Sequence, residues 1–230
     1  MNSFMVRSFV LLIIFLTAIK IYAVFSTTFS LFGDEAQYWL WSQDLDFGYL
    51  SKPPLIAWIL YFYTSLFGDS FEVLKLFPII FYFFTSVAVY SFCRKLDLQK
   101  SISLICALSF LVMPGVSVSS FLISTDVILL FFWIVSMSVL IEIRKKPSLK
   151  NFLVLGIMLG LSFLTKYAAI YFFISLAVLL FFDTHLRGVL YANKLKFIIF
   201  LITVFIVILP NIIWNISNGW LTFVHTSDNA

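Results

Sequence analysis

The sequence has little charge and little cysteine. Only 11% of its 230 residues are Asp, Glu, Lys or Arg, and Cys93 and Cys106 are its two cysteines. A soluble domain typically carries charge on about a quarter of its residues, so this composition excludes a soluble core. Both cysteines fall in or beside apolar segments, and they imply neither a disulfide framework nor a thiolate metal site.

Apolar residues fill the rest of the chain. They make up 62% of it, and the mean hydropathy is +1.07. Several apolar runs approach the roughly 20 residues that a helix needs to cross a bilayer. Backbone amides in lipid must bond within their own segment, and these runs do not alternate as barrel strands do. We therefore expect an all-α, polytopic transmembrane helical bundle, a single domain over 1–230 with about seven spans, near 8–26, 72–92, 102–120, 126–142, 151–165, 167–182 and 197–213.

Three local features refine this layout. The first run is long and lacks a small-residue cleavage pattern, which favours a retained span over a signal peptide. Pro114-Gly115 predicts a kink or an early exit in the third span, because proline removes a helical hydrogen bond. Lys166 and Tyr167 are expected to form a tight turn between the fifth and sixth spans.

One shorter run, Leu55 to Phe67, decides the orientation. It is too short to span, and its less apolar positions recur with the helical period, so we expect an interfacial amphipathic helix within a large first outer loop. With the N-terminus inside, eleven Lys and Arg residues then lie on the cytoplasmic side and three, Lys52, Lys75 and Lys166, on the outer side. This asymmetry follows the positive-inside rule. The net charge of +4 thus reflects topology and contact with anionic membrane lipid, and no pattern of nucleic-acid binding is present.

Two adjacent acids on the outer side are the first candidate site residues. Asp34 and Glu35 belong to the run Gly-Asp-Glu-Ala-Gln-Tyr-Trp at 33–39. A structural explanation is that acids in the first turn of a helix complement its macrodipole. A functional explanation is that one carboxylate acts as a general base toward an acceptor hydroxyl. Neighbouring helical residues point about 100° apart, so we expect only one of the pair to face a given pocket.

The candidate phosphate-binding residues come from other segments. Lys52 precedes two prolines and could snorkel to lipid or hold a lipid-linked phosphate as a leaving group. Asp126 opens the fourth span, where it could cap the helix, although Ser124 and Thr125 serve that purpose equally well. Lys166 and Tyr167 are interfacial anchors or further phosphate partners.

These segments together resemble a known family. Its pattern is carried by Gly-Asp-Glu-Ala-Gln-Tyr-Trp at 33–39, Tyr-Leu-Ser-Lys-Pro-Pro-Leu-Ile-Ala-Trp at 49–58, Ser-Thr-Asp at 124–126, Pro-Asn-Ile-Ile-Trp-Asn at 210–215 and Asn-Gly-Trp-Leu-Thr-Phe at 218–223. The chain resembles the bacterial relatives of dolichyl-phosphate-mannose protein mannosyltransferases, a group that includes the undecaprenyl-phosphate-aminoarabinose lipid A transferases. All have the GT-C fold and correspond to glycosyltransferase families 39 and 83.

The resemblance implies a membrane glycosyltransferase of the bacterial inner membrane with a periplasmic active site. Its partners would be a polyprenyl-phosphate sugar donor and a lipid, glycan or protein acceptor. Asp34 matches the family's expected base, with Glu35 as the second catalytic acid, and Lys52 and Asp126 match its donor-site residues. Some lipid A transferases have a metal-binding glutamate where this chain has Ser51, so a divalent cation stays an open alternative.

Length is the second departure from the family. Members usually carry eleven or more spans and often a soluble C-terminal domain, so we expect a C-terminally truncated or split member. The alternative function is that of a non-catalytic membrane protein, either a lipid or sugar transporter or a degenerate scaffold of the same fold. Transporters typically place paired broken helices near the midplane, whereas the charges here gather near the helix ends.

Overall fold

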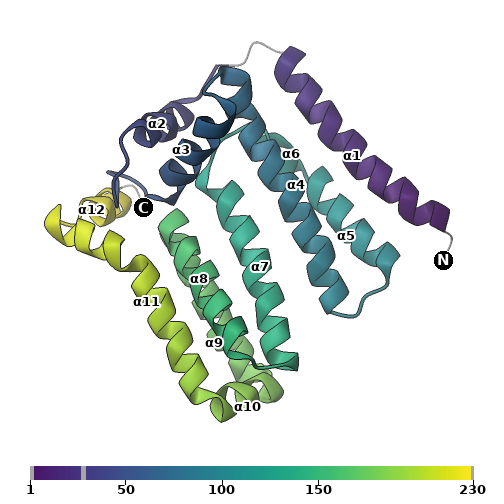
Figure 1. The fold of residues 1–230 in the computed structure, drawn as a ribbon, viewed down its shortest axis with the longest axis vertical. Helices are drawn as coiled ribbons and strands as arrows, with labels where there is room; N and C mark the ends of the chain where they lie inside the picture. The colour runs from purple at the N-terminus through teal and green to yellow at the C-terminus, as the bar shows by residue number, and fades with distance from the viewer. Residues whose placement is uncertain (1–2, 27–29, 229–230) are drawn as a thin grey trace.

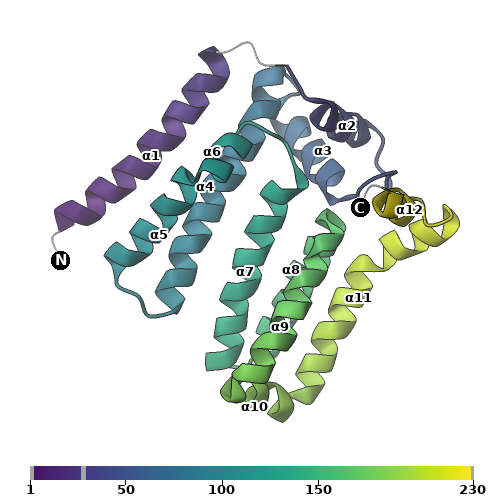
Figure 2. The ribbon, with the colours of Figure 1, turned by 180° about the vertical axis from the view of Figure 1, so that it is seen from behind.

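The chain forms a bundle of helices that stand side by side. The computed structural model describes residues 3–26 and 30–228, and these contain helices and no strands. Across Figure 1 the order of the long helices is α1, α5, α4, α7, α8 and α11, and α9 lies behind α7 and α8 (Figure 1 and Figure 2). Their bounds are α1 Ser3–Ser26, α4 Phe71–Lys95, α5 Lys100–Val112, α7 Thr125–Lys145, α8 Leu149–Thr165, α9 Ile170–Phe182 and α11 Lys194–Ser217.

Shorter elements close the two ends of the bundle. At one end lie α2, α3 and α12; at the other lies α10 (Figure 1). Their bounds, with those of α6 and the 3₁₀ helix η1, are α2 Gly33–Gln43, α3 Leu55–Phe67, α6 Pro114–Ser119, η1 Tyr167–Ala169, α10 Thr184–Ala192 and α12 Leu221–Asp228.

All seven predicted spans are helical, and four of the helices can cross a membrane by length and composition. These are Val6–Ser26, Phe71–Lys95, Thr125–Lys145 and Lys194–Ser217. A fifth is added if Tyr167–Phe182 and Thr184–Ala192, which meet at 105°, count as one span. Helices α5 and α8 have 13 and 17 residues and fall below that length. The all-helical class is therefore confirmed, and the count of seven stays a prediction.

The predicted break in the third span is confirmed. Helix α5 ends at Val112, and α6 begins at Pro114. The break deprives the last turn of α5 of its usual backbone partners, and side chains replace them. The carbonyl oxygen of Leu111 accepts from Ser117 Oγ at 3.1 Å and from Lys20 Nζ at 3.3 Å. The one lysine inside α1 thus satisfies a carbonyl that is left free because α5 ends at Val112.

Helices α8 and α11 pack closely because α8 presents glycines to its neighbour. A Cβ atom at Gly156 would lie 2.7 Å from Thr203, and one at Gly160 would lie 2.6 Å from Val207. No residue larger than glycine fits at either position at this separation of the helices. The contact fixes α11 against the centre of the bundle, and α11 in turn carries residues that hold the outer loop in place.

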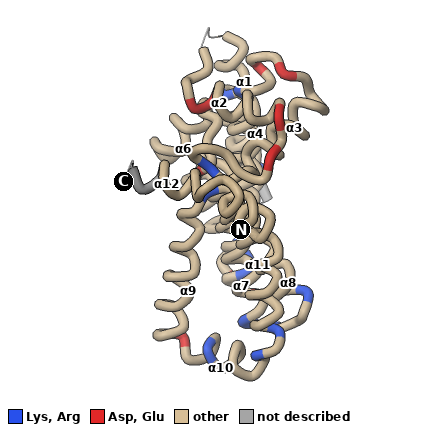
Figure 3. The backbone as a smooth tube through the Cα atoms, turned by 90° about the vertical axis from the view of Figure 1, so that its left-hand side faces the viewer, with Lys and Arg blue, Asp and Glu red and all other residues tan. Residues whose placement is uncertain are grey.

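Charge divides the bundle into two ends. Figure 3 shows Asp and Glu gathered mainly around α2 and α3, and Lys and Arg mainly around α10. We call the first the acidic end; it includes α2, α3, α12 and the segments 119–125 and 165–167. We call the second the basic end; it includes α10 and the segments 95–100 and 145–149. This arrangement matches the topology inferred from the sequence, in which the basic end faces the cytoplasm.

Helix α3 has the bounds predicted for the interfacial segment. Leu55, Ile56 and Leu60 are buried, while Phe62 and Leu66 are exposed. The helix packs against α2, α4 and α8 at the acidic end. Its position along the membrane surface stays a prediction.

Candidate active site at the acidic end

The two adjacent acids diverge, as expected for neighbouring helical residues. Helix α2 begins at Gly33, so Asp34 and Glu35 both lie in its first turn. The Asp34 side chain is exposed, whereas Glu35 is only 1% exposed. Only Asp34 is therefore free to meet a solvent-borne acceptor.

Glu35 forms a buried ion pair that the sequence did not reveal. Its Oε2 lies 2.6 Å from Lys75 Nζ and accepts from the Phe32 backbone N–H at 2.9 Å. Its Oε1 accepts from the Ile123 N–H at 2.8 Å. Lys75 also donates to the Phe121 carbonyl oxygen at 3.0 Å. The pair thus ties α2, α4 and the segment before α7 into one rigid corner, and a catalytic role for Glu35 stays a prediction.

Asp126 and Lys166 meet at the top of α7 and α8. The Lys166 Nζ lies 2.8 Å from Asp126 Oδ1, and both side chains are partly exposed. Ser124 occupies the N-cap position of α7 without a side-chain capping bond, and the Asp126 oxygen is directed at Lys166. Two of the predicted donor-phosphate residues are therefore brought together.

Tyr38 connects these two groups of acids. It lies one turn after Asp34 on α2 and is 3% exposed. Burial, with the Asp34 and Asp126 carboxylates nearby, raises the pKa of Tyr38 to about 12. Both carboxylates therefore lie near enough to affect one buried phenol, and all three residues belong to the acidic end. Tyr38 belongs to the 33–39 motif, but the sequence did not single it out.

The loop that carries Lys52 is held in place from two directions. Within the first outer loop, the Trp41 and Tyr49 rings stack with their centroids 4.6 Å apart, and the Tyr49 hydroxyl accepts from the Asp46 N–H at 3.0 Å. Gly48 lies so close to Trp214 that a Cβ would meet the indole at 2.3 Å. Bonds to α11 and α12 complete the attachment: Trp214 Nε1 to Asp46 Oδ2 at 2.6 Å, Asn211 Nδ2 to the Phe47 oxygen at 2.7 Å, and Thr222 Oγ1 to the Tyr49 oxygen at 2.7 Å.

Lys52 itself presents a cation without a counter-ion. Its backbone oxygen accepts from the Tyr49 N–H at 3.2 Å. Within residues 3–26 and 30–228, its ammonium group makes no ion pair or hydrogen bond, and no contact joins it to Asp34 or Asp126. The structure places Lys52 at the same end of the bundle as these acids, on a rigid loop.

Tyr167 contacts the helices that hold the Lys52 loop and makes no hydrogen bond with Asp126. Its hydroxyl donates to Asn211 Oδ1 at 3.0 Å and accepts from Asn215 Nδ2 at 3.2 Å, and its ring stacks on Phe223 with centroids 4.5 Å apart. The structure therefore joins Tyr167 to α11 and α12, while its neighbour Lys166 points to Asp126.

A cavity opens beside the acidic motif. It has a volume of about 440 Å³ and is lined by 32–35 and 122–124, which include both Asp34 and Glu35. Across the described part of the chain, no three or more His, Cys, Asp or Glu side chains group closely enough to hold a metal ion. The cavity is thus a space in which an acceptor could approach the Asp34 carboxylate.

Known proteins resemble this chain in sequence. The lipid A galacturonosyltransferase RgtD of Rhizobium johnstonii is 36% identical over 201 residues, which cover 86% of this chain and 41% of the relative. The undecaprenyl phosphate-alpha-4-amino-4-deoxy-L-arabinose arabinosyl transferase of Wigglesworthia glossinidia brevipalpis is 30% identical over 132 residues, 53% of this chain and 22% of the relative. No solved structure matches significantly.

The chain therefore spans less than half the length of either relative. Its apolar helices and these relatives identify a multi-pass integral membrane protein. The model of the family described as dolichyl-phosphate-mannose-protein mannosyltransferase matches residues 51–214, which include Lys52, Asp126 and Lys166. The chain belongs to this family of membrane glycosyltransferases.

Proposed function

We propose that this chain provides the catalytic end of a glycosyltransferase that moves a sugar from a polyprenyl-phosphate donor to an acceptor at the periplasmic face of the inner membrane. The observation that carries the proposal is the gathering of Asp34, Tyr38, Asp126 and Lys166 at the acidic end. The name of the first relative favours lipid A as the acceptor class, and the name of the second favours a polyprenyl-phosphate-linked sugar as the donor.

The proposed reaction is a single displacement at the anomeric carbon of the donor sugar. The acceptor hydroxyl oxygen forms the new bond to that carbon, and the bond from the carbon to the phosphate oxygen breaks. The lipid phosphate leaves with the electron pair, and Asp34 takes the hydroxyl proton as general base. Attack from the face opposite the phosphate inverts the configuration of the sugar.

The cations supply the second half of the chemistry. The leaving phosphate gains charge as the bond breaks, so a fixed ammonium group nearby lowers the barrier. Lys52 suits this role because its charge has no partner within the described residues and its loop is rigid. Lys166 lies at the same end, but the Asp126 carboxylate partly neutralises its ammonium group. Lys166 therefore binds an anion more weakly than Lys52.

No step is assigned to a metal. The family position that carries glutamate in some members is Ser51 here, and a serine next to Lys52 does not offer a divalent cation the carboxylate it prefers. The described residues contain no compensating cluster of acids or histidines.

The test is transfer of a labelled sugar from polyprenyl phosphate to lipid A in vesicles that contain the protein as it is encoded. Asp34→Asn should lower the rate by roughly 10²- to 10⁴-fold with unchanged membrane insertion. Asp69→Asn is the matched control, because Asp69 is also an exposed acid of the first outer loop but lies outside the site. Equal rates for the two variants would overturn the role of Asp34, whereas no transfer by the unaltered protein would favour the non-catalytic alternative.

A further inference from the structure

A second large cavity lies at the basic end, remote from the candidate active site. It is a groove of about 650 Å³ between the last turns of α4, the C-terminal half of α7 and the face of α9. Its body is apolar and includes Trp133, Met137 and Leu176, while Arg144 and Lys145 stand at its mouth. The groove thus combines an apolar channel with a charged entrance.

The depth of the groove matches one leaflet of a bilayer. Trp133 and Arg144 both line it and are eleven residues apart on α7, which corresponds to roughly 17 Å at ~1.5 Å per residue. Half of a ~30 Å hydrocarbon core is about 15 Å. A single acyl chain that enters beside Arg144 therefore reaches Trp133 near the bilayer midplane.

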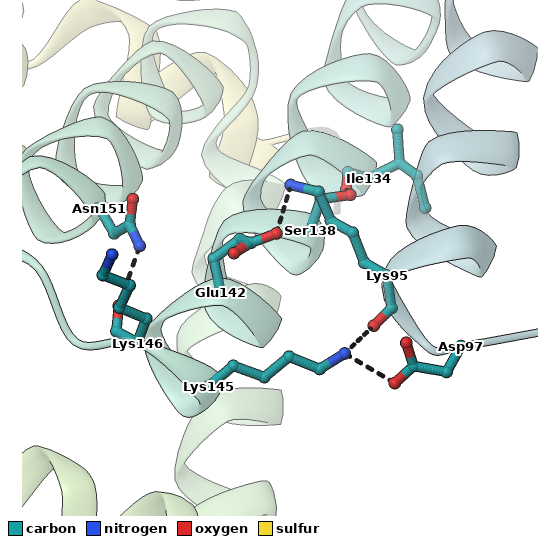
Figure 4. A network of polar contacts seen from close by, with 8 residues as sticks. All are labelled: Lys95, Asp97, Ile134, Ser138, Glu142, Lys145, Lys146 and Asn151. Atoms are coloured by element: carbon teal, nitrogen blue, oxygen red, sulfur yellow. Dashed lines mark hydrogen bonds and ion pairs between the residues drawn. The ribbon is translucent and has the colours of Figure 1, made fainter.

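The mouth carries ion pairs that another anion can replace. Arg144 Nε lies 2.9 Å from Asp183 Oδ2, and Lys145 Nζ lies 2.8 Å from Asp97 Oδ2. Figure 4 shows Lys145 reaching both Asp97 and the Lys95 carbonyl oxygen. The Arg144 and Lys145 side chains are each 46% exposed, and pairs as exposed as these contribute little to stability. Exchange of a carboxylate for a phosphate therefore costs little.

The charge of the whole end favours an anionic occupant. The basic end holds ten Lys and Arg residues, at 94, 95, 100, 144, 145, 146, 150, 187, 194 and 196, against three acids, Asp97, Glu142 and Asp183, an excess of seven positive charges. Basic pockets between transmembrane helices on the cytoplasmic side are typical binding sites for anionic phospholipids.

We propose that this groove binds an anionic glycerophospholipid of the cytoplasmic leaflet. One acyl chain lies between α7 and α9, and the phosphate lies between Arg144 and Lys145. The bound lipid would fill the space between α9 and α7 and hold the two helices at a fixed separation. This site is independent of sugar transfer at the acidic end.

Trp133 provides the direct test. The other five tryptophans, at 39, 41, 58, 214 and 220, lie at the acidic end, so Trp133 alone reports on the groove. The protein is placed in phosphatidylcholine nanodiscs that contain a minor fraction of a lipid brominated in mid-chain. In one preparation the brominated lipid is phosphatidylglycerol, and in the other it is phosphatidylcholine. We expect stronger fluorescence quenching by the brominated phosphatidylglycerol, and Trp133→Phe should remove this difference.

Two variants separate headgroup recognition from chain binding. Arg144→Gln with Lys145→Gln should abolish the preference for phosphatidylglycerol, whereas Lys150→Gln with Lys194→Gln, exposed cations of the same end that do not line the groove, should keep it. Ser175→Phe fills the groove from α9 without a change of charge and should remove Trp133 quenching by either lipid. That variant serves as an independent test if the double charge change impairs insertion.

Three results would overturn the proposal. Equal quenching of Trp133 by the two brominated lipids would show contact without recognition of the anionic headgroup. No quenching of Trp133 by either lipid would show that the groove is filled by protein. Full quenching in Ser175→Phe would place the lipid elsewhere.

Discussion

Replacement of Lys75 by methionine should destabilise the acidic end severely. The change leaves Glu35, 1% exposed, without its counter-charge at 2.6 Å. Methionine matches the length of the lysine stem, so packing is largely kept and the loss is electrostatic. Removal of one partner from a buried pair typically costs ~3–5 kcal/mol, because the remaining charge stays buried without compensation.

The double variant Glu35→Gln with Lys75→Met should recover much of that loss. Its neutral amide carries no buried charge, and its carbonyl oxygen can still accept from the Ile123 or Phe32 N–H that Glu35 binds now. The residual cost is that of two backbone groups that lose a partner, one of these N–H groups and the Phe121 carbonyl oxygen, at about 1 kcal/mol each. The recovery distinguishes an uncompensated charge from a simple loss of packing.

The free energy of unfolding can be measured by titration with a denaturing detergent in mixed micelles, followed by near-ultraviolet circular dichroism. Lys145→Met is the matched control, because it removes the same group from the exposed pair with Asp97 and should change the midpoint very little. The reasoning fails if Lys75→Met costs no more than Lys145→Met, or if the double variant is as unstable as the single one.

Three further outcomes are expected. Lys52→Gln should lower sugar transfer roughly 10- to 100-fold without a change in unfolding midpoint, because its ammonium group holds no partner within the described residues; a shifted midpoint would assign it a structural role instead. Gly160→Ala should lower the free energy of unfolding by about 1–3 kcal/mol through the 2.6 Å contact with Val207, whereas Gly115→Ala, where a Cβ meets nothing within 4 Å, should not. Tyr38 keeps its proton up to a pKa of about 12 when folded and loses it near 10.0 when unfolded, so its contribution to stability is present below that lower value and is lost as pH rises toward 12. Tyr38→Phe should therefore flatten the alkaline decline in stability, and an unchanged decline would contradict this.

Local sequence signals predicted the helices well. Apolar runs predicted the helical segments within a few residues, and the bounds of α3 agree with the predicted 55–67. Helix α5 ends shortly before Pro114, which has no backbone N–H with which to continue the helix. Lys166 and Tyr167 form the turn that their polarity indicated between two apolar runs. Such features depend only on neighbours in the chain.

The partners within the site could not be predicted in this way. Glu35 and Lys75 are 40 residues apart, and periodicity carries no information about which helices become neighbours. Lys75 is one of three outer cations and lies near the start of a mainly apolar helix, a position that indicates a buried acid nearby. That Asp34 and Asp126 lie at the same end of the bundle likewise depends on how the helices pack, which only the fold determines.

The attachment of the first outer loop to α11 has a consequence for biosynthesis. Asp46 and its indole partner Trp214 are separated by 168 residues, and ribosomes add about 5–20 residues per second. Lys52 is therefore translated roughly ten to thirty seconds before the helix that secures its loop. During that interval the nascent chain already contains Lys52, but the loop that carries it is not fixed until α11 and α12 are in place.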